Sequence, residues 1–309
     1  MMLLLKLDHW QPGYGLGWVA DHLRVMGESM KQVVVVTDSA STVPEALMQE
    51  LNIRVVPILL HLADHTYRDG VDLTPDQFYQ LLRTSKQVPS TSAPSVGDVA
   101  RIYAAAAQDA SGVVGIHLPP NLSATYGLAV MASELVAGPP IRILDSRSVA
   151  MGQGFVVLEA ARSAAAGADL EAVGARAEEV ATKVRFLAAL ETLEYLRRGG
   201  RIGGAAALLG GMLRITPIVQ VVDSQVEPFA KPRTRGRAIQ MMLGEMARQV
   251  GDRPVHVAVM QGDAAQEAED LRLVVSQQFN CLELLVTEFT PVMGAHAGPG
   301  LLGIAFFAD

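Results

Sequence analysis

Four short apolar runs divide the first half of the chain, and stretches with helical spacing separate them. The runs are Val33–Val36, Arg54–Leu60, Gly112–Leu118 and Ile141–Leu144. A continuous β-branched run such as Val33–Val36 is typical of a strand that is buried on both faces of a parallel sheet. Because strands alternate with helices here, we expect right-handed crossovers and an N-terminal α/β domain with a parallel sheet.

Helix-start signals precede three of the intervening stretches. Thr74–Gln77 combines a threonine cap with proline at the first helical position, which predicts a helix over the following residues. Ser95 is followed by an acidic residue three positions later and predicts a second capped helix. Thr42 and Glu45 have the spacing of a capping box, so we expect them to begin a short helix that ends near Leu51.

The second half has a different pattern, with two helices followed by six apolar runs. We expect the helices from Ser148 to about Ala166 and from Asp169 to about Val184. The expected strands are Arg185–Leu190, Thr216–Val222, Gln225–Lys231, Val255–Met260, Leu282–Phe289 and Leu301–Phe307. Few crossovers separate them, so we predict a C-terminal α+β domain with a mostly antiparallel six-stranded sheet. Asp263 is expected to cap a helix between two of these strands.

The length of the chain favours two domains. It has 309 residues, of which 50% are hydrophobic, and single cores stop growing near ~250–300 residues. We place the domains at residues 31–166 and 167–309. Residues 1–29 show no periodicity. We expect them to be an extension that is either disordered or the result of a mis-assigned start, with Met30 as the natural first residue.

Charge and cysteine content exclude several classes of protein. The formal net charge of −7 argues against a nucleic-acid-binding protein. The single cysteine, Cys281, excludes an internal disulfide and a cysteine zinc cluster, and it fits a reducing cytoplasm. No apolar run approaches the ~18 residues of a membrane span. We therefore expect a cytoplasmic protein without a membrane span.

One segment departs from the acidic character of the chain. Between Arg197 and Arg237 there are eight basic residues and two acidic ones. The basic residues are Arg197, Arg198, Arg201, Arg214, Lys231, Arg233, Arg235 and Arg237. A basic patch on an acidic protein indicates an anionic ligand or an acidic partner surface, although a solvated face would have the same pattern.

Hydroxyl groups are concentrated in Pro89–Ser95, which contains Ser90, Thr91, Ser92 and Ser95. Proline biases the residue before it to an extended conformation, so we expect these hydroxyls to be displayed along a loop that leads into a helix. Several neutral donors near a helix start can bind one anion. A capped turn without a ligand is the simpler interpretation of the same residues.

Polar residues also follow three of the four predicted N-terminal strands. They are Thr37–Ser39, Asn121–Ser123 and Asp145–Ser146. The carboxyl ends of parallel strands lie at one edge of the sheet, where ligands bind in such folds. We therefore expect a site at this edge, while helix capping alone stays open as an explanation for Asp145–Ser146.

His296 lies among small residues in Met293–Gly300, which we interpret as a glycine-rich loop. Such a loop lets the backbone approach a ligand closely, and a histidine near a carboxylate can donate a hydrogen bond. His61 and His65 have no cysteine partner, so we interpret them as surface residues and expect no metal site. The chain has no G-x-S-x-G, P-loop or G-x-G-x-x-G motif, and we expect no nucleotide cofactor.

Taken together, these segments resemble the DegV family of bacterial fatty-acid-binding proteins. The matching segments, in the order of the family, are Thr37–Ser39, Tyr67–Gly70, Pro89–Ser95, Leu122–Tyr126, Asp145–Ser146, Leu193–Ile202, Arg214–Ile218 and His296–Gly300. The similarity spans residues 31–309, and Leu193–Ile202 and His296–Gly300 are its most specific parts. It implies two α/β domains with a lipid between them, in agreement with the division above.

The resemblance also implies a set of ligand-binding residues. The candidates are Thr91, Ser123, His296 and Arg201, with Ser92 and Ser39 as second-line candidates. In the family, residues that correspond to Thr91, Ser123 and His296 hold the fatty-acid carboxylate, and Arg201 corresponds to an arginine near the ligand mouth. Ala93 stands where the family usually has a polar residue, which alters the surroundings of this site.

By this resemblance the protein binds a long-chain fatty acid, for example palmitate, and is not an enzyme. Some family members present the acid to a separate fatty acid kinase that makes an acyl phosphate, so we expect such a kinase as a partner. No cofactor, catalytic residue or metal ligand is implied. Two alternatives stay open. One is a hydrolase in which Ser39 or Ser123 uses His296 as its base. The other is a relative of the dihydroxyacetone kinases, in which His296 bonds covalently to a carbonyl.

Overall fold

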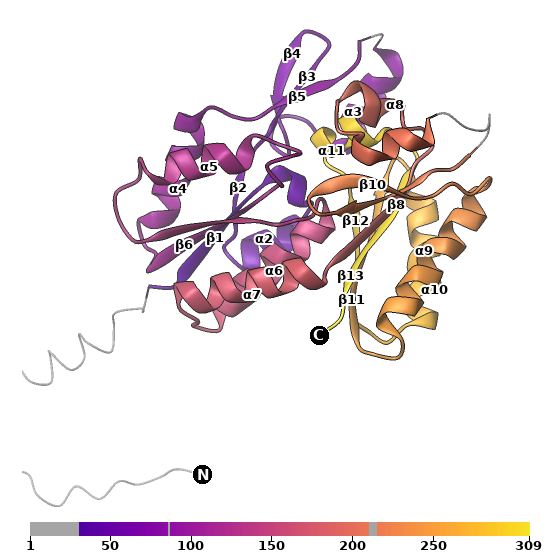
Figure 1. Cartoon of the computed structure of the whole chain (residues 1–309). Coiled ribbons are helices and arrows are strands. Elements are labelled where there is room, and N and C mark those ends of the chain that lie inside the picture. The colour runs from indigo at the N-terminus through magenta and orange to yellow at the C-terminus, as the bar shows by residue number, and fades with distance from the viewer. Residues whose placement is uncertain (1–30, 86, 210–214) are drawn as a thin grey trace, which may run out of the picture. The chain divides into compact units, whose positions relative to one another are not determined.

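Figure 1 shows the computed structural model, which describes residues 31–85, 87–209 and 215–309. Gln32–Asp309 forms one compact unit. The expected extension, the expected start at Met30 and the basic residue Arg214 lie outside the described residues. Within the described ranges, no helix is long and apolar enough to cross a membrane.

The first half of this unit contains the expected parallel sheet. Its strands are β1 (Val33–Asp38), β2 (Arg54–Val56), β6 (Gly112–His117) and β7 (Ile141–Asp145), in the order β2-β1-β6-β7. All three pairings are parallel, as predicted. Val35 and Val36 of β1 belong to different core clusters, because successive side chains of a strand point to opposite faces.

Helices cover both faces of this sheet (Figure 1). On one face lie α4 (Val96–Ala107) and α5 (Thr125–Ser133), and on the other lie α2 (Glu45–Glu50), α6 (Met151–Ala165) and α7 (Leu170–Lys183). The apolar strands are therefore buried from both sides. This confirms the alternating strand and helix pattern of the first half of the chain.

Two of the predicted helix caps are confirmed. The Thr74 hydroxyl accepts a hydrogen bond from the backbone of Gln77 at the start of α3 (Pro75–Thr84), and the Gln77 side chain accepts one from the Thr74 backbone. The Ser95 hydroxyl accepts a hydrogen bond from the backbone of Asp98 at the start of α4. Both caps use residues within one turn of each other, so sequence spacing was sufficient to predict them.

Two other predicted caps are wrong. Thr42 adopts a left-handed backbone conformation (φ 52°), and its buried hydroxyl has no hydrogen-bond partner in the described structure. Helix α2 begins only after Pro44. Asp263 does not cap α10 (Ala265–Gln278), because its carboxylate pairs at 2.6 Å with Arg83, which lies far away in the sequence.

The predicted strand Arg54–Leu60 is wrong as a single element. The structure divides it into β2 and β3 (Leu59–Leu62), which belong to different sheets. Pro57 lies between them and cannot donate a backbone hydrogen bond. Strand β3 is the middle strand of a small antiparallel sheet with β4 (His65–Arg68) and β5 (Ser90–Ser92). We expected the hydroxyl residues of Pro89–Ser95 to lie in a loop, but the first three of them, Ser90–Ser92, form strand β5.

The second half contains the expected six-stranded sheet. Its strands are β8 (Arg185–Ala189), β9 (Ile218–Val222), β10 (Gln225–Ala230), β11 (Val255–Gly262), β12 (Cys281–Glu288) and β13 (Leu301–Phe307), in the order β10-β9-β8-β13-β11-β12. Every pairing is antiparallel except that of β11 with β12. Helices α9 (Arg235–Val250) and α10 share the core of one face, and α8 (Glu194–Arg198) and α11 (Pro291–Ala297) share the core of the other.

One core cluster joins the two halves of the unit. Phe155 of α6 packs edge-to-face against Phe307 of β13, with ring centroids 5.4 Å apart. His256 of β11 stacks on the ring of Phe307 at 4.6 Å. Helix α6 therefore contacts both the parallel sheet and the six-stranded sheet. The domain boundary near residue 166 stays a prediction.

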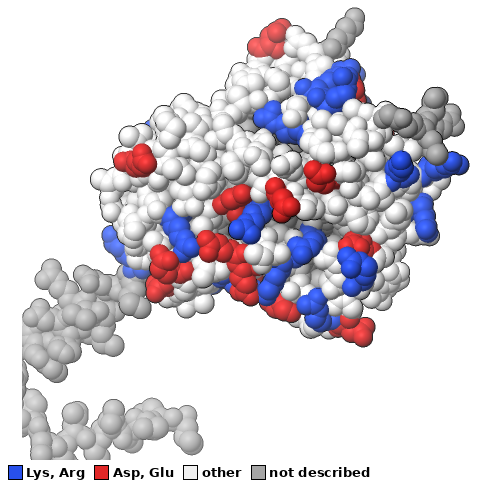
Figure 2. Space-filling model, in the orientation of Figure 1, with Lys and Arg blue, Asp and Glu red and all other residues white. Residues whose placement is uncertain are grey.

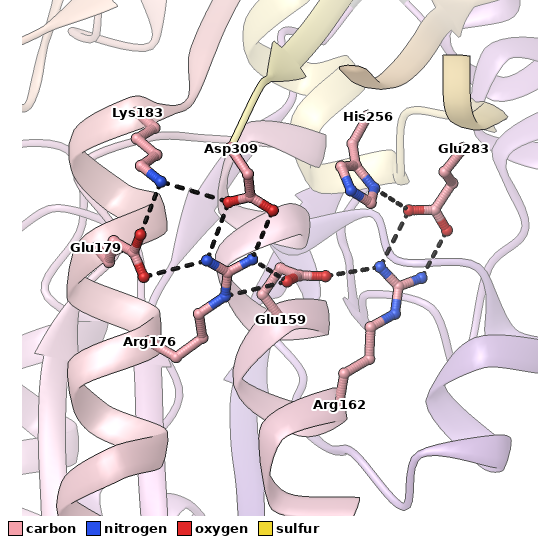
Figure 3. A network of polar contacts seen from close by, with 8 residues as sticks. All are labelled: Glu159, Arg162, Arg176, Glu179, Lys183, His256, Glu283 and Asp309. Carbon is pink, nitrogen blue, oxygen red and sulfur yellow. Dashed lines mark hydrogen bonds and ion pairs between the residues drawn. The ribbon is translucent and has the colours of Figure 1, made fainter. Parts of the chain in front are cut away.

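A network of ion pairs connects the same elements (Figure 3). Arg162 of α6 pairs with Glu159 at 2.8 Å and with Glu283 of β12 at 2.6 Å. Arg176 of α7 pairs with Glu159 and with Asp309, which follows β13. Figure 2 shows acidic and basic side chains interspersed along the lower middle of one face of the molecule. Charges from both halves of the chain thus neutralise one another at this junction.

Candidate functional site

A cavity lies between the small sheet, the loop after β6 and one face of the six-stranded sheet. It encloses about 930 Å³ that protein atoms do not fill, part of it open to solvent. Most of its lining is apolar and includes Phe186 and Ala188 of β8, Val219 of β9 and Leu301 of β13. Its polar lining residues are Thr91, Ser92, Ser123, Arg201 and His296. The structure thus brings five of the six predicted ligand-binding residues to one cavity.

The sequence predicted a loop around His296, and this prediction is wrong. The structure places His296 on helix α11. Pro291 begins this helix, and Gly298, with a φ of 76°, follows its last residue. Proline favours the first helical position and glycine the position after the end, which explains a helix in a glycine-rich segment. The Nε2 atom of His296 lies 2.8 Å from the hydroxyl oxygen of Thr91 on β5. Two predicted carboxylate-binding residues are therefore in direct contact.

The other imidazole nitrogen of His296, Nδ1, is buried and has no hydrogen-bond partner among the described residues. It lies against Gly199, where a β-carbon would collide with the ring. Burial, together with the positive charge of Arg201, lowers the pKa of His296 to about 4. The imidazole is therefore neutral at pH 7, so one of its two nitrogens carries a proton and can donate a hydrogen bond to an anion.

Two backbone carbonyls fix the guanidinium of Arg201. Its Nη1 atom donates to the carbonyl of Gly199 at 2.7 Å, and its Nε atom donates to the carbonyl of Leu122 at 3.1 Å. Across the described ranges, no ion pair joins Arg201 to a carboxylate, whereas Arg197 in the same basic segment pairs with Glu194. Arg201 therefore keeps a positive charge available for an anion in the cavity.

Ser123 enters the cavity from the loop between β6 and α5. Its hydroxyl oxygen lies 2.7 Å from the hydroxyl of Thr125 and accepts a hydrogen bond from the Thr125 backbone. Asp38, at the end of β1, holds this loop by accepting a hydrogen bond from the backbone of Leu118 at 2.9 Å. The end of β1 thus helps to hold the loop that contains Ser123.

Asp38 also begins a buried chain of hydrogen bonds. Its carboxylate lies 3.1 Å from Nδ1 of His117, and Nε2 of His117 lies 2.6 Å from the hydroxyl of Tyr103. All three side chains are fully buried and none of them lines the cavity. This hydrogen-bond network therefore fixes the ends of β1 and β6 and lies outside the cavity.

The two second-line candidates lie in different places. Ser92 lines the cavity, and its hydroxyl lies 2.8 Å from Nε2 of His61, a residue to which the sequence gave no role. Ser39 is buried just after β1, where its hydroxyl accepts a hydrogen bond from the backbone of Ile58. Ser39 lines a second cavity and not the one that contains His296.

A serine hydrolase needs a serine that is hydrogen-bonded to its base. Among the described residues, neither Ser39 nor Ser123 forms a hydrogen bond with His296, whose hydroxyl partner is Thr91. The geometry provides hydrogen-bond donors for an anion and does not provide an activated serine.

Sequence reasoning missed the apolar lining of the cavity. In β8, Phe186 and Ala188 face the cavity, while Leu187 and Ala189 face the core under α9 and α10. All four residues are apolar, so strand alternation cannot tell which face borders a cavity. The contact of Gly199 with His296 was also missed, because no sequence signal connects two residues so far apart.

Comparison with known proteins covers nearly the whole described chain. A family model described as "Uncharacterised protein, DegV family" matches residues 32–309. The chain is 36% identical over 276 residues to the DegV domain-containing protein SCO2569 of Streptomyces coelicolor, covering 89% of this chain and 98% of that protein. It is 30% identical over 278 residues to Protein DegV of Bacillus subtilis, covering 89% and 98%.

Solved structures have the same fold. A structure described as "Fatty Acid Binding of a DegV family Protein from Thermus thermophilus" matches with a TM-score of 0.85 and 31% identity, over 90% of this chain and 100% of that one. A structure described as "Crystal Structure of DegV, a fatty acid binding protein from Bacillus subtilis" matches with a TM-score of 0.84 and 28% identity, over the same shares. Both confirm the predicted fold class.

Proposed function

Because this chain belongs to the DegV family, we propose that it binds one long-chain fatty acid, such as palmitate, in the cavity beside the six-stranded sheet. The observation that carries this proposal is the composition of the cavity. Hydrogen-bond donors from Thr91, Ser123 and His296 gather there, and the remaining walls are largely apolar. The two related structures named above are described as fatty-acid-binding proteins, which supports the same ligand class.

We assign the fatty-acid carboxylate to Thr91, Ser123 and His296. The hydroxyls of Thr91 and Ser123 and the Nε2–H group of His296 each donate a hydrogen bond to the carboxylate, which takes the place of the contact between Nε2 and Thr91. Charge-assisted bonds of this kind are stronger than bonds between neutral groups. Arg201 lies close enough to lower the pKa of His296, so its positive charge also acts on an anion bound there. In this arrangement neutral donors stabilise the charge of the carboxylate, and no direct ion pair with Arg201 is needed.

The acyl chain lies against the apolar walls of the cavity, including Leu190, Val219 and Met293. Each buried methylene group contributes about 0.8 kcal/mol. A chain of about 14 methylene groups therefore contributes about 11 kcal/mol before the cost of ordering the chain. Affinity is expected to rise with chain length until the cavity is filled.

In this proposal the protein is a binding subunit and not an enzyme. Its sequence has no nucleotide-binding motif, so the phosphoryl donor has to be bound by a separate fatty acid kinase. A carboxylate oxygen of the presented acid attacks the γ-phosphorus of the nucleoside triphosphate that the kinase binds, so that an acyl phosphate forms and the nucleoside diphosphate leaves. We expect this partnership in the cytoplasm, which the single cysteine favours.

Mass spectrometry of the purified full chain tests the binding. The protein is measured under native conditions and again after denaturation and solvent extraction. We expect one long-chain fatty acid per protein, released on denaturation, or uptake of one added palmitate by protein stripped of lipid. Stripped protein that takes up neither palmitate nor oleate would refute the proposal.

Three control experiments separate binding from the alternatives. The protein alone, with ATP and palmitate, should form no acyl phosphate, and formation of this product would contradict the role of a binding subunit. Turnover of an ester that is lost in Ser123→Ala would favour the hydrolase alternative. Covalent capture of dihydroxyacetone by His296 would favour the relationship with the dihydroxyacetone kinases.

A further inference from the structure

Asp69 is a buried carboxylate in the Tyr67–Gly70 segment, outside the cavity assigned to the fatty acid. Only 2% of its surface is exposed. Its backbone N–H donates to the carbonyl of Ile58 at 2.9 Å, which fixes the residue just after β4. Its Oδ1 atom accepts a hydrogen bond from the backbone N–H of Val292 at 3.0 Å. Asp69 thus joins the small sheet to helix α11.

The bond to Val292 lies at the start of the helix that carries His296. Backbone N–H groups in the first turn of a helix have no partner within the helix, and a carboxylate there satisfies one of them at the positive end of the helix dipole. His296 lies near the other end of α11 and contacts Thr91. Asp69 adjoins β4 and Thr91 lies on β5, and both strands pair with β3. The small sheet therefore holds α11 at both ends.

We propose that Asp69 is a positioning residue for the carboxylate-binding end of the cavity, which fixes the first turn of α11 and thereby holds His296 in line with Thr91. This inference rests on the proposed function, because it concerns the same site. Asp69 itself does not line the fatty-acid cavity, so it acts through the helix and not through contact with the ligand.

Asp69 lies in a buried environment in which the described residues provide no cationic partner. It lines a second cavity together with the hydroxyl residues Ser39, Ser41, Thr42 and Thr290, and no lysine or arginine lines that cavity. Its second oxygen, Oδ2, has no hydrogen-bond partner in the described part of the chain. Burial raises the pKa of Asp69 to about 6, although the Val292 N–H and the nearby hydroxyls of Ser39 and Thr290 oppose this shift. A buried carboxylate without a cationic partner is costly, so its use at the start of α11 needs another reason.

The test compares Asp69→Ala and Asp69→Asn with a matched control, Asp72→Ala. Alanine removes the acceptor, and asparagine keeps an oxygen acceptor without the charge. Asp72 lies three positions further on, is exposed and pairs with Arg68, so its loss should leave α11 unchanged. Three properties are measured: hydrogen exchange at the Val292 amide, the pKa of His296 by NMR without fatty acid, and the rate at which palmitate dissociates.

We expect the Val292 amide of the unmodified protein to be protected from exchange, although first-turn amides are normally open. In Asp69→Ala this protection is lost, and the pKa of His296 rises by about one unit because the imidazole becomes better solvated. Palmitate dissociates about 5- to 10-fold faster in Asp69→Ala, with a smaller effect in Asp69→Asn and none in Asp72→Ala.

Two results would overturn the proposal. One is a Val292 amide that exchanges freely in the unmodified protein, a measurement that needs no variant to fold. The other is a folded Asp69→Ala protein in which Val292 protection, the His296 pKa and palmitate dissociation all match those of the unmodified protein. If the unmodified protein binds no fatty acid, the proposed function fails, while the measurements at Val292 and His296 still decide whether Asp69 positions the helix.

Discussion

The Nε2 atom of His296 lies 2.8 Å from the hydroxyl of Thr91, although 205 positions separate the two residues in the chain. Thr91 comes from the small sheet of the first half, and His296 comes from a helix between two strands of the six-stranded sheet. Both residues line the cavity. The proposed carboxylate site therefore exists only when both halves of the chain are folded against each other.

We predict that His296→Ala and Ser123→Ala each weaken palmitate binding. Each substitution removes one donor from a buried carboxylate, which costs about 1.5–3 kcal/mol, or roughly a ten- to hundredfold rise in Kd. Titration of stripped protein with palmitate measures the change. Ser276→Ala on the exposed surface of α10 serves as the control and should bind as the unmodified protein does. Unchanged affinity in both site variants would rule out the site assignment.

Gly199→Ala tests whether the position of His296 matters. The backbone of Gly199 has a φ of −73°, which alanine adopts without strain, but the new β-carbon would collide with the imidazole. We expect palmitate affinity to fall by about tenfold and the free energy of unfolding to change by less than about 1 kcal/mol, since the collision displaces one side chain. The measurements are palmitate titration and denaturant unfolding.

Two comparisons make the Gly199 test specific. Gly127→Ala on α5 meets no atom within 4 Å and should leave binding unchanged. In a His296→Ala background, Gly199→Ala should have no further effect, because the side chain with which it collides is gone. A full additional loss in that background would show that Gly199 acts in some other way.

Asp69→Asn is predicted to raise stability above neutral pH while it loosens palmitate binding. Burial raises the pKa of Asp69 from 3.8 to about 6 in the folded state, so the folded protein binds this proton more tightly than the unfolded chain does. The stability that this provides is fully present below pH 3.8 and is lost as the pH rises through 6. The difference between the two pKa values corresponds to at most about 3 kcal/mol.

Denaturant unfolding at pH 4.5 and pH 7.5 measures this effect. The stability of Asp69→Asn relative to the unmodified protein should increase from the lower to the higher pH. A relative stability that is the same at both values would mean that the folded-state pKa of Asp69 is not raised.

Arg162→Gln is predicted to destabilise the junction in Figure 3. Burial opposes ionisation of Glu283, yet hydrogen bonds from His256 and Arg162 hold its pKa at about 2. The side chain of Arg162 is 33% exposed, and those of Glu283 and Glu159 are 16% and 11% exposed. Removing Arg162 takes this partner away from both carboxylates. We expect a loss of about 1–3 kcal/mol, less than for a fully buried pair because solvent screens part of it.

A surface pair provides the control for Arg162. Arg272→Gln breaks an exposed pair with Glu269 on α10 and should cost less than about 0.5 kcal/mol. The effect of Arg162→Gln should shrink in 1 M salt, and palmitate affinity should not change, because Arg162 does not line the cavity. Equal losses in the two variants would show that the network adds nothing to an ordinary surface pair.

Local signals in the sequence predicted much of the fold. Ser95 and Thr74 cap their helices with residues one turn away, so spacing alone identified them. Thr42 and Asp263 have similar spacing, but tertiary contacts decide their conformations, and both predictions failed. Strand β3 was missed because an apolar run on both sides of Pro57 looks like one strand until its two partners are known.

The candidate site was predictable only in part. Thr91, Ser123 and His296 were named through resemblance to a family, and the structure brings all three to one cavity. Nothing local in the sequence shows that Gly199 makes room for His296 or that Asp69 reaches the start of α11. Both contacts join residues far apart in the chain, and such contacts follow from packing and not from sequence periodicity.

The position of β13 has a consequence for synthesis of the protein. This strand comes last along the chain, yet it lies in the middle of the six-stranded sheet, between β8 and β11. While the ribosome still holds Leu301–Phe307, the sheet consists of two unjoined pieces with open edges, which are the kind of surface that chaperones shield. Leu301 also lines the cavity. Strands β8 and β11 can therefore be joined only once β13 has been made, and the part of the cavity wall that Leu301 provides is added with it.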